Sequence, residues 1–121
     1  MIAVPQILVS DDDSAFREVV CESLARRGFR VTEAIDGKQA IELWRRDDGD
    51  FHLCLVDFHM PGANGLEVVR FVQSYQPAGQ SQGDEDCRQP TPCVLMSAEL
   101  TDPIRREAES AQVFRVLSKP L

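Results

Sequence analysis

The sequence ILVSDD, residues 7–12, is a short apolar run that ends in two carboxylates. Three later runs end in polar residues in a similar way: LCLVD at 53–57, VLMS at 94–97 and VLSK at 116–119. Short apolar runs of this kind are typical of buried strands. Because the carboxyl ends of parallel strands lie at one edge of a sheet, we expect these polar residues to converge on a single pocket.

Strands are expected to alternate with helices along the whole chain, which favours a parallel sheet with helices on both faces. The expected strands are Gln6–Ser10, Arg30–Ala34, Phe51–Val56, Cys93–Met96 and Phe114–Leu117. The expected helices are Ser14 to Gly28, Lys38–Arg46, Leu66–Tyr75 and a helix capped by Thr101 or Asp102 that ends near Ala111. The first helix would carry Phe16, Val19, Val20 and Leu24 on its buried face.

This order of elements predicts an α/β fold in one domain, residues 1–121. Right-handed crossovers leave few arrangements, and the favoured one is a flavodoxin-like, doubly wound, five-stranded parallel sheet in the order 2-1-3-4-5. In that order Asp11 and Asp12 face Asp57 across the crevice between the first and third strands. Periodicity alone does not determine the strand order.

Composition narrows the class of protein. The chain has 121 residues, of which 43% are hydrophobic and 27% charged, as in ordinary globular domains. Its net charge of −7 argues against direct nucleic-acid binding by this domain. No apolar run approaches the ~20 residues needed to cross a membrane, and the start lacks a signal-peptide pattern, so we expect a cytoplasmic protein. The four cysteines form no C-x-x-C pair and are expected to be inert thiols.

Two features depart from a regular alternation. Residues 76–92 form a polar stretch that is long for a connection, and we interpret it as a surface loop insertion. The sequence stops at Leu121, after the fifth strand, so a final helix is missing and the domain is expected to be C-terminally truncated. One face of the sheet would then lack cover, exposing Val94, Met96 or Val116. Self-association, or another segment over the gap, is the expected consequence.

The acidic residues at the strand ends suit a divalent cation. Mg²⁺ prefers oxygen ligands and usually keeps several waters beside one or two carboxylates. Asp12 and Asp57 would bind it directly, Asp11 would act through water, and the backbone carbonyl of His59 would be a further ligand. Mn²⁺ would substitute.

Asp57 also has the chemistry of a nucleophile, because a carboxylate that attacks phosphorus forms an acyl phosphate. Lys119 would neutralise charge on the transferred oxygens, which gives Asp57 and Lys119 catalytic roles. Ser97 would donate a hydrogen bond to the new phosphoryl group and pull its own loop inward.

These motifs together resemble the receiver domain of two-component response regulators. The matching segments are ILVSDD at 7–12, VDFHMPGANG at 56–65, VLMSA at 94–98 and SKP at 118–120. The resemblance implies that Asp57 accepts phosphate from a sensor histidine kinase or a phosphotransfer protein. It also implies Mg²⁺ near Asp11, Asp12 and Asp57, with Ser97 and Lys119 as switch and phosphate-binding residues. Gln112 stands where the family commonly has glycine.

The function expected from this reading is a phosphorylation-controlled signalling switch with an unknown output domain or effector. Such a module catalyses its own phosphorylation and dephosphorylation but is not a turnover enzyme. One alternative is a small phosphatase of the haloacid-dehalogenase type, because Asp11 and Asp13 satisfy its Asp-x-Asp motif. Another is a receiver-like interaction module that is never phosphorylated. His59 also has two possible roles. In the alternative to a carbonyl ligand, its ring would bind the metal or accept phosphate.

Overall fold

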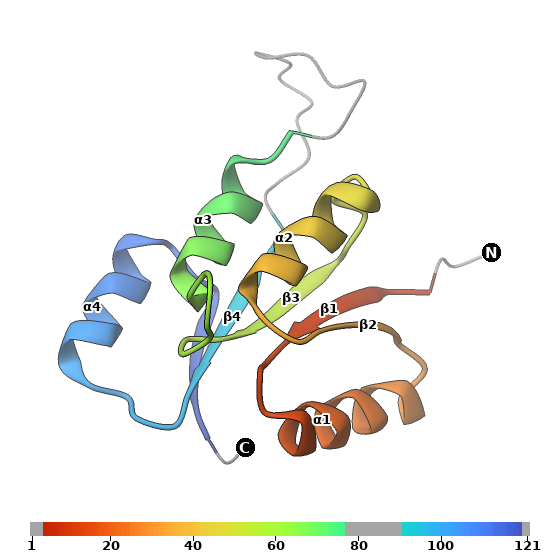
Figure 1. Ribbon diagram of the computed structural model, residues 1–121, viewed down its shortest axis with the longest axis horizontal. Coiled ribbons are helices and arrows are strands. Elements are labelled where there is room, and N and C mark those ends of the chain that lie inside the picture. Colours follow the sequence, from red (N-terminus) through yellow and green to blue (C-terminus); the bar gives the residue numbers. More distant parts are fainter. Residues whose placement is uncertain (1–3, 77–90, 120–121) are drawn as a thin grey trace.

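The computed structural model describes residues 4–76 and 91–119 as one parallel sheet with four helices (Figure 1). The strands are β1 (Gln6–Ser10), β2 (Arg30–Ala34), β3 (Leu53–Asp57), β4 (Cys93–Ser97) and β5 (Arg115–Ser118). The helices are α1 (Ser14–Arg26), α2 (Gly37–Arg46), α3 (Gly65–Ser74) and α4 (Asp102–Ser110). The strand order β2-β1-β3-β4-β5 confirms the predicted flavodoxin-like topology. None of the helices in these ranges has the length and apolarity that a bilayer crossing requires.

Each helix begins at a polar side chain that accepts a hydrogen bond from the first turn. Asp13 caps α1, Asp36 caps α2, Asn64 caps α3 and Thr101 caps α4. Such caps satisfy backbone N–H groups that have no partner inside the helix. Because every helix starts just after the carboxyl end of a strand, the caps gather at the same edge of the sheet as the predicted pocket.

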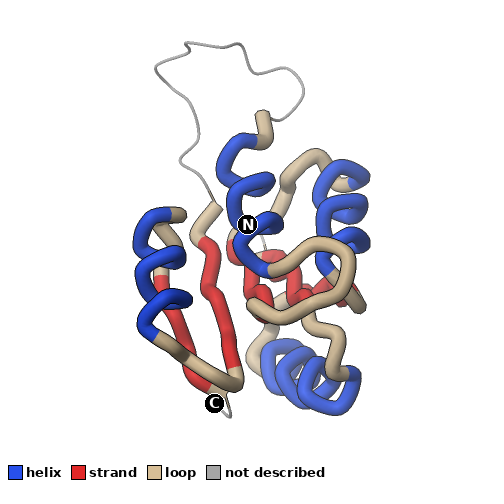
Figure 2. The backbone as a smooth tube through the Cα atoms, turned by 60° about the vertical axis from the view of Figure 1, so that its left-hand side comes forward, coloured by secondary structure: helices blue, strands red, loops and turns tan. Residues whose placement is uncertain are grey.

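The sheet divides the apolar core in two, because successive strand residues point to opposite faces. Leu8, Val56 and Leu95 belong to the cluster that residues of α2, α3 and α4 cover. Val9 and Met96 belong to the other cluster, which α1 covers. Figures 1 and 2 show α1 standing apart from the other three helices. One face therefore carries three helices and the opposite face carries one.

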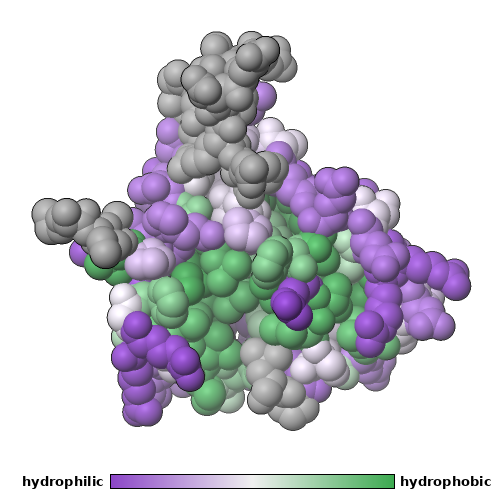
Figure 3. All heavy atoms as spheres, turned by 180° about the vertical axis from the view of Figure 1, so that it is seen from behind, coloured by the Kyte–Doolittle hydropathy of each residue, from purple (hydrophilic) through white to green (hydrophobic). Residues whose placement is uncertain are grey.

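The predicted exposure of the face under α1 was wrong for two of the three named residues. Val94 and Met96 are buried, Met96 completely, because Phe16 and Val20 of α1 pack onto the cluster to which both belong. Val116 is partly buried and packs on the opposite face. Figure 3, which views the molecule from behind, shows hydrophobic residues gathered on the back of the molecule as Figure 1 draws it. The self-association expected from this face stays a prediction.

Two smaller predictions also need correction. Val19 is 67% exposed, because the buried stripe of α1 runs through Phe16, Val20 and Leu24, and Val19 lies about 100° round the helix from its centre. The third strand begins at Leu53 rather than Phe51. The Phe51 ring instead stacks on Trp44 of α2, with 5.1 Å between the ring centroids.

Most of the predicted insertion, residues 77–90, lies outside the described residues. At its far end, the Pro92 carbonyl accepts a hydrogen bond from the Cys54 amide, and the Thr91 hydroxyl donates one to the Phe51 carbonyl. The chain is therefore already held beside β3 before β4 begins.

Candidate functional site

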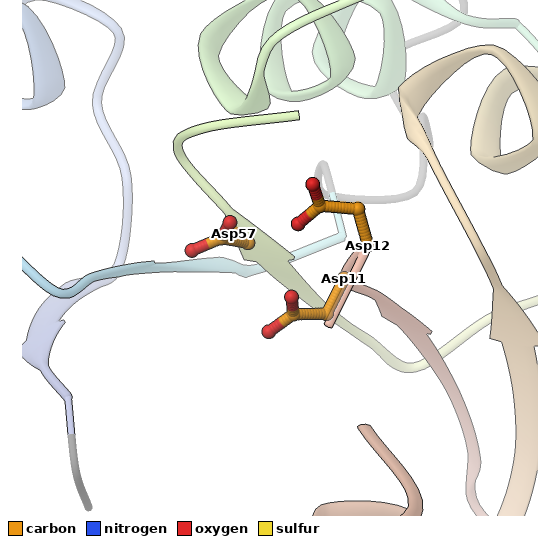
Figure 4. A group of neighbouring side chains, drawn as sticks. All are labelled: Asp11, Asp12 and Asp57. Carbon is orange, nitrogen blue, oxygen red and sulfur yellow. The ribbon is translucent and has the colours of Figure 1, made fainter. Parts of the chain in front are cut away.

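Three aspartates from two neighbouring strands meet at the carboxyl edge of the sheet. Asp11 and Asp12 follow β1, and Asp57 is the last residue of β3. One carboxylate oxygen from each residue lies within 4.8 Å of those of the other two. Figure 4 shows the three carboxylates directed to the same side. The structure therefore brings together the acidic set predicted from the sequence.

Asp11 is fully buried, and both its side chain and its backbone carbonyl accept hydrogen bonds. Its Oδ1 accepts a hydrogen bond from the Asp13 amide at 2.9 Å, and its backbone carbonyl accepts one from Arg17 Nη1 at 2.7 Å. Arg17 also donates through Nε to Glu33 Oε1 at 3.2 Å. These contacts hold the turn between β1 and α1 and orient the Asp11 carboxylate within it.

Asp57 is only 5% exposed and sits under the start of α3. The approach of that helix requires glycine at position 65, because a Cβ there would lie 2.5 Å from the Asp57 carbonyl oxygen. Burial raises the pKa of the Asp57 carboxyl, and the neighbouring charge of Asp11 raises it further, although Lys119 opposes both. Without a further cation, the folded protein therefore stabilises the ionised form of Asp57 less well than water does.

Lys119, directly after β5, supplies the positive charge within the cluster. Its Nζ lies 2.6 Å from Asp11 Oδ2 and 3.2 Å from Asp57 Oδ1, and its side chain is 13% exposed. Burial lowers the pKa of this ammonium, but the hydrogen bond to Asp11 and the charge of Asp57 outweigh that effect, and the pKa is raised overall. The lysine is therefore held in its charged form between the two carboxylates.

Ser97 ends β4 at the same edge and is fully buried. Its hydroxyl donates a 2.7 Å hydrogen bond to the Glu99 carbonyl and accepts one from the Glu99 amide at 3.2 Å. The Ser97 carbonyl accepts from the Lys119 amide at 2.9 Å. Ser97 is thus beside Lys119 along the backbone, with its hydroxyl engaged by its own loop.

His59 lies in the loop after β3 and lines a surface cavity of about 390 Å³ together with Asp12. The other lining residues are Phe58, Met60, Pro61 and Asn64. The His59 ring is exposed and packs edge-on against Phe58, with 4.7 Å between the centroids. This position is next to the acidic cluster, and the role of its carbonyl stays a prediction.

The second acid of the Asp-x-Asp motif does not join this cluster. The Asp13 carboxylate accepts hydrogen bonds from the amides of Ala15 and Phe16 and so caps α1. A phosphatase of the haloacid-dehalogenase type would need this residue in the pocket. Asp13 therefore serves the helix, which removes the feature that suggested the phosphatase.

The donor set fits a divalent cation. Three carboxylates and one ammonium leave a formal excess of two negative charges in a largely buried site. Carboxylate oxygens are the ligands that Mg²⁺ prefers, and the exposed Asp12 leaves room for the waters that this ion keeps. Asp11, Asp12 and Asp57 are therefore the described residues best placed to hold it.

Two neighbours of the cluster were not identified from the sequence. Arg17 reaches the Asp11 carbonyl from α1, and the Phe16 ring lies under the Lys119 ammonium, 4.2 Å from Nζ. Both lie in the first turn of α1, where sequence periodicity indicates only which face is buried. The one available signal is position, since the first turn of a helix that follows β1 must lie near the strand ends.

Comparison with known proteins identifies the family of this chain. Residues 7–121 match the response regulator receiver domain family. The chain belongs to this family.

Similar curated proteins include the sensory/regulatory protein RpfC of Xanthomonas campestris, 31% identical over 116 residues. The match covers 96% of this chain and 15% of RpfC. The DNA-binding transcriptional regulator NtrC of Azospirillum brasilense is 34% identical over 115 residues, covering 94% of this chain and 21% of NtrC. The chain thus spans about a fifth or less of the length of these relatives.

Solved structures share the fold closely. The chemotaxis protein CheY4 of Vibrio cholerae has a TM-score of 0.79 at 26% identity, covering 98% of this chain and 89% of CheY4. The receiver domain of NarL from Mycobacterium tuberculosis has a TM-score of 0.78 at 29% identity, covering 99% and 87%. The fold predicted from the strand pattern is therefore that of known receiver domains.

Proposed function

We propose that this domain accepts a phosphoryl group onto Asp57 in a Mg²⁺-dependent reaction and acts as a phosphorylation-controlled switch. The observation that carries the proposal is the setting of Asp57. It is a nearly buried carboxylate at a strand end, 3.2 Å from the Lys119 ammonium and within 4.8 Å of the two other acids. Membership of the receiver family supports the same function.

In the transfer step, a carboxylate oxygen of Asp57 forms a bond to phosphorus. The bond between phosphorus and the histidine nitrogen of a sensor kinase or phosphotransfer protein breaks, and the nitrogen keeps the electron pair. Lys119 neutralises the oxygens of the incoming group. Asp11, Asp12 and Asp57 would hold Mg²⁺, or Mn²⁺ in its place, which supplies further neutralisation of phosphoryl charge. Hydrolysis of the acyl phosphate would return Asp57, so the domain resets itself without turning over a separate substrate.

Ser97 would convert this chemistry into a change of shape. Its hydroxyl now donates to the Glu99 carbonyl, so donation to a phosphoryl oxygen on Asp57 would release that carbonyl. The loop between β4 and α4 would then lose one of its anchors. A local bond exchange of this kind is how charge-changing modifications shift a packed segment.

The partners follow from the same reading. RpfC is named as a sensory/regulatory protein and NtrC as a DNA-binding transcriptional regulator, so we infer that an output domain or effector reads the state of Asp57. The net charge of −7 argues that any nucleic-acid contact belongs to that partner. We place the domain in the cytoplasm, in keeping with the free thiols of the three described cysteines, Cys21, Cys54 and Cys93.

Acetyl phosphate provides a direct test without the kinase. With Mg²⁺ and this donor, intact-mass measurement should detect one added phosphoryl group on the wild type and none on Asp57→Asn. Asp36→Asn is the matched control, because Asp36 also follows a strand but caps α2, and asparagine caps equally well. Equal labelling of Asp57→Asn would refute the assignment. An unlabelled wild type would favour the interaction module that is never phosphorylated.

A further inference from the structure

Lys119 has an uncharged neighbour in addition to its two carboxylates. Its Nζ lies over the ring of Phe16, 4.2 Å from the ring centroid. Phe16 belongs to the first turn of α1, which lies close to the end of β5 (Figure 1). An ammonium over the face of an aromatic ring is attracted to it. The charged end of Lys119 is thus held by Asp11, Asp57 and the ring.

These neighbours respond differently to a second cation. The carboxylates of Asp11 and Asp57 are among the oxygens that a divalent cation would engage, and such a cation also repels the ammonium. The Phe16 ring offers no oxygen to a metal and keeps its attraction for Lys119. The lysine stem is flexible and carries much rotamer entropy, so an ammonium that lost its carboxylates would otherwise be free to turn into solvent.

We propose that Phe16 is a positioning residue that retains Lys119 at the pocket while a divalent cation occupies the acidic cluster. The inference rests on the proposed function, because it concerns the metal-bound state in which Asp57 would receive its phosphoryl group. Lys119 is useful in that state only if its ammonium stays beside Asp57. The ring is then the partner of Lys119 that the metal does not compete for.

Phe16 also packs on the apolar cluster beneath α1, so a purely structural role has to be separated from positioning. Phe16→Tyr keeps the ring face, whereas Phe16→Leu keeps an apolar side chain without the ring. Phe114→Leu is the matched control. It removes another ring that has a cation near it, Arg115 at 6.0 Å, at the opposite end of β5.

The chain itself simplifies the measurement, because it contains only two lysines, Lys38 and Lys119. Selective ¹³C labelling of lysine in the 121-residue chain would report side-chain order at each Cε by NMR relaxation, with the exposed Lys38 as internal reference. Without metal, Lys119 should be ordered in every variant, because Asp11 and Asp57 hold it. With saturating Mg²⁺, it should stay ordered in the wild type, Phe16→Tyr and Phe114→Leu, but approach the mobility of Lys38 in Phe16→Leu.

A rate measurement gives the second readout. Phe16→Leu should slow labelling by acetyl phosphate about 2- to 30-fold, the range that cation–π attraction spans. The same change in a Lys119→Met background should leave the residual rate unaltered, whereas a structural role would slow both backgrounds equally.

The two ways of failing are distinct. Equal Lys119 order in Phe16→Leu and the wild type, with Mg²⁺ bound and Asp57 labelled, would overturn the inference alone. If Mg²⁺ does not perturb the wild-type cluster at all, the proposed function fails and the inference fails with it.

Discussion

The two ends of the sheet differ in what they bury. At the carboxyl end the buried residues include Asp11, Asp57 and Ser97, whereas at the opposite end Trp44 stacks on Phe51 beneath the C-terminus of α2. Burial raises the pKa of Asp57, so the carboxyl end holds a charge that folding does not favour. The apolar end gains from burial directly. Stability is therefore expected to come mainly from one end and chemistry from the other.

Truncation at the apolar end should have the largest effect. Trp44→Ala removes a large, almost completely buried side chain and should lower the free energy of unfolding by about 3–5 kcal/mol. Among the described residues the Trp44 indole N–H has no hydrogen-bond partner, so Trp44→Phe should lose volume but no hydrogen bond. Urea denaturation measures both. A loss below about 1 kcal/mol for the alanine variant would show that this end is not where stability lies.

Removing a charge at the carboxyl end should instead raise the free energy of unfolding. Without metal at pH 7, Asp57→Asn should raise the free energy of unfolding by about 1 kcal/mol, because it removes a disfavoured charge. The folded pKa lies above the ordinary value of 3.8, so the wild type is penalised as pH rises through the folded pKa. The gain should therefore disappear as pH falls below 3.8. Asp36→Asn should change little at either pH, and a destabilised Asp57→Asn would contradict the comparison.

The apolar end is not free of strain, which a smaller effect should reveal. Asp48 and Gln112 are the two non-glycine residues in the described ranges with left-handed backbones, and both lie in turns at this end. Gln112 has φ +57°, a conformation that glycine adopts freely. Gln112→Gly should therefore raise the free energy of unfolding by up to about 1 kcal/mol, and with it the melting temperature. Gln112→Ala should raise neither. No gain from the glycine would mean that neighbouring contacts already compensate the strain.

The sequence was enough to predict the fold and the meeting of the strand ends. Apolar runs locate strands, and parallel topology places their ends together, so the convergence of Asp11, Asp57 and Lys119 follows without knowledge of any side chain. The role of Ser97 rests mainly on the family resemblance, since a serine after a strand is more often a helix cap.

What the sequence could not supply were contacts between elements. The buried stripe of α1 excludes Val19, and the cover that α1 gives to Met96 depends on how the helix lies across the strands. Likewise, Phe16 and Lys119 are far apart in the chain, and no periodicity relates them. Side-chain reach across an interface is a tertiary property, so local patterns do not contain it.

The carboxyl end of the sheet holds an excess of negative charge, which a divalent cation should relieve. The most direct measurement is the melting temperature with and without saturating Mg²⁺ for the wild type and for Asp12→Ala, with Ca²⁺-free buffer and Asp36→Asn as the control. Binding to the folded state alone raises apparent stability. We expect a clear rise in melting temperature for the wild type and Asp36→Asn, and little or none for Asp12→Ala. An equal rise in all three proteins, or no rise in the wild type, would contradict it.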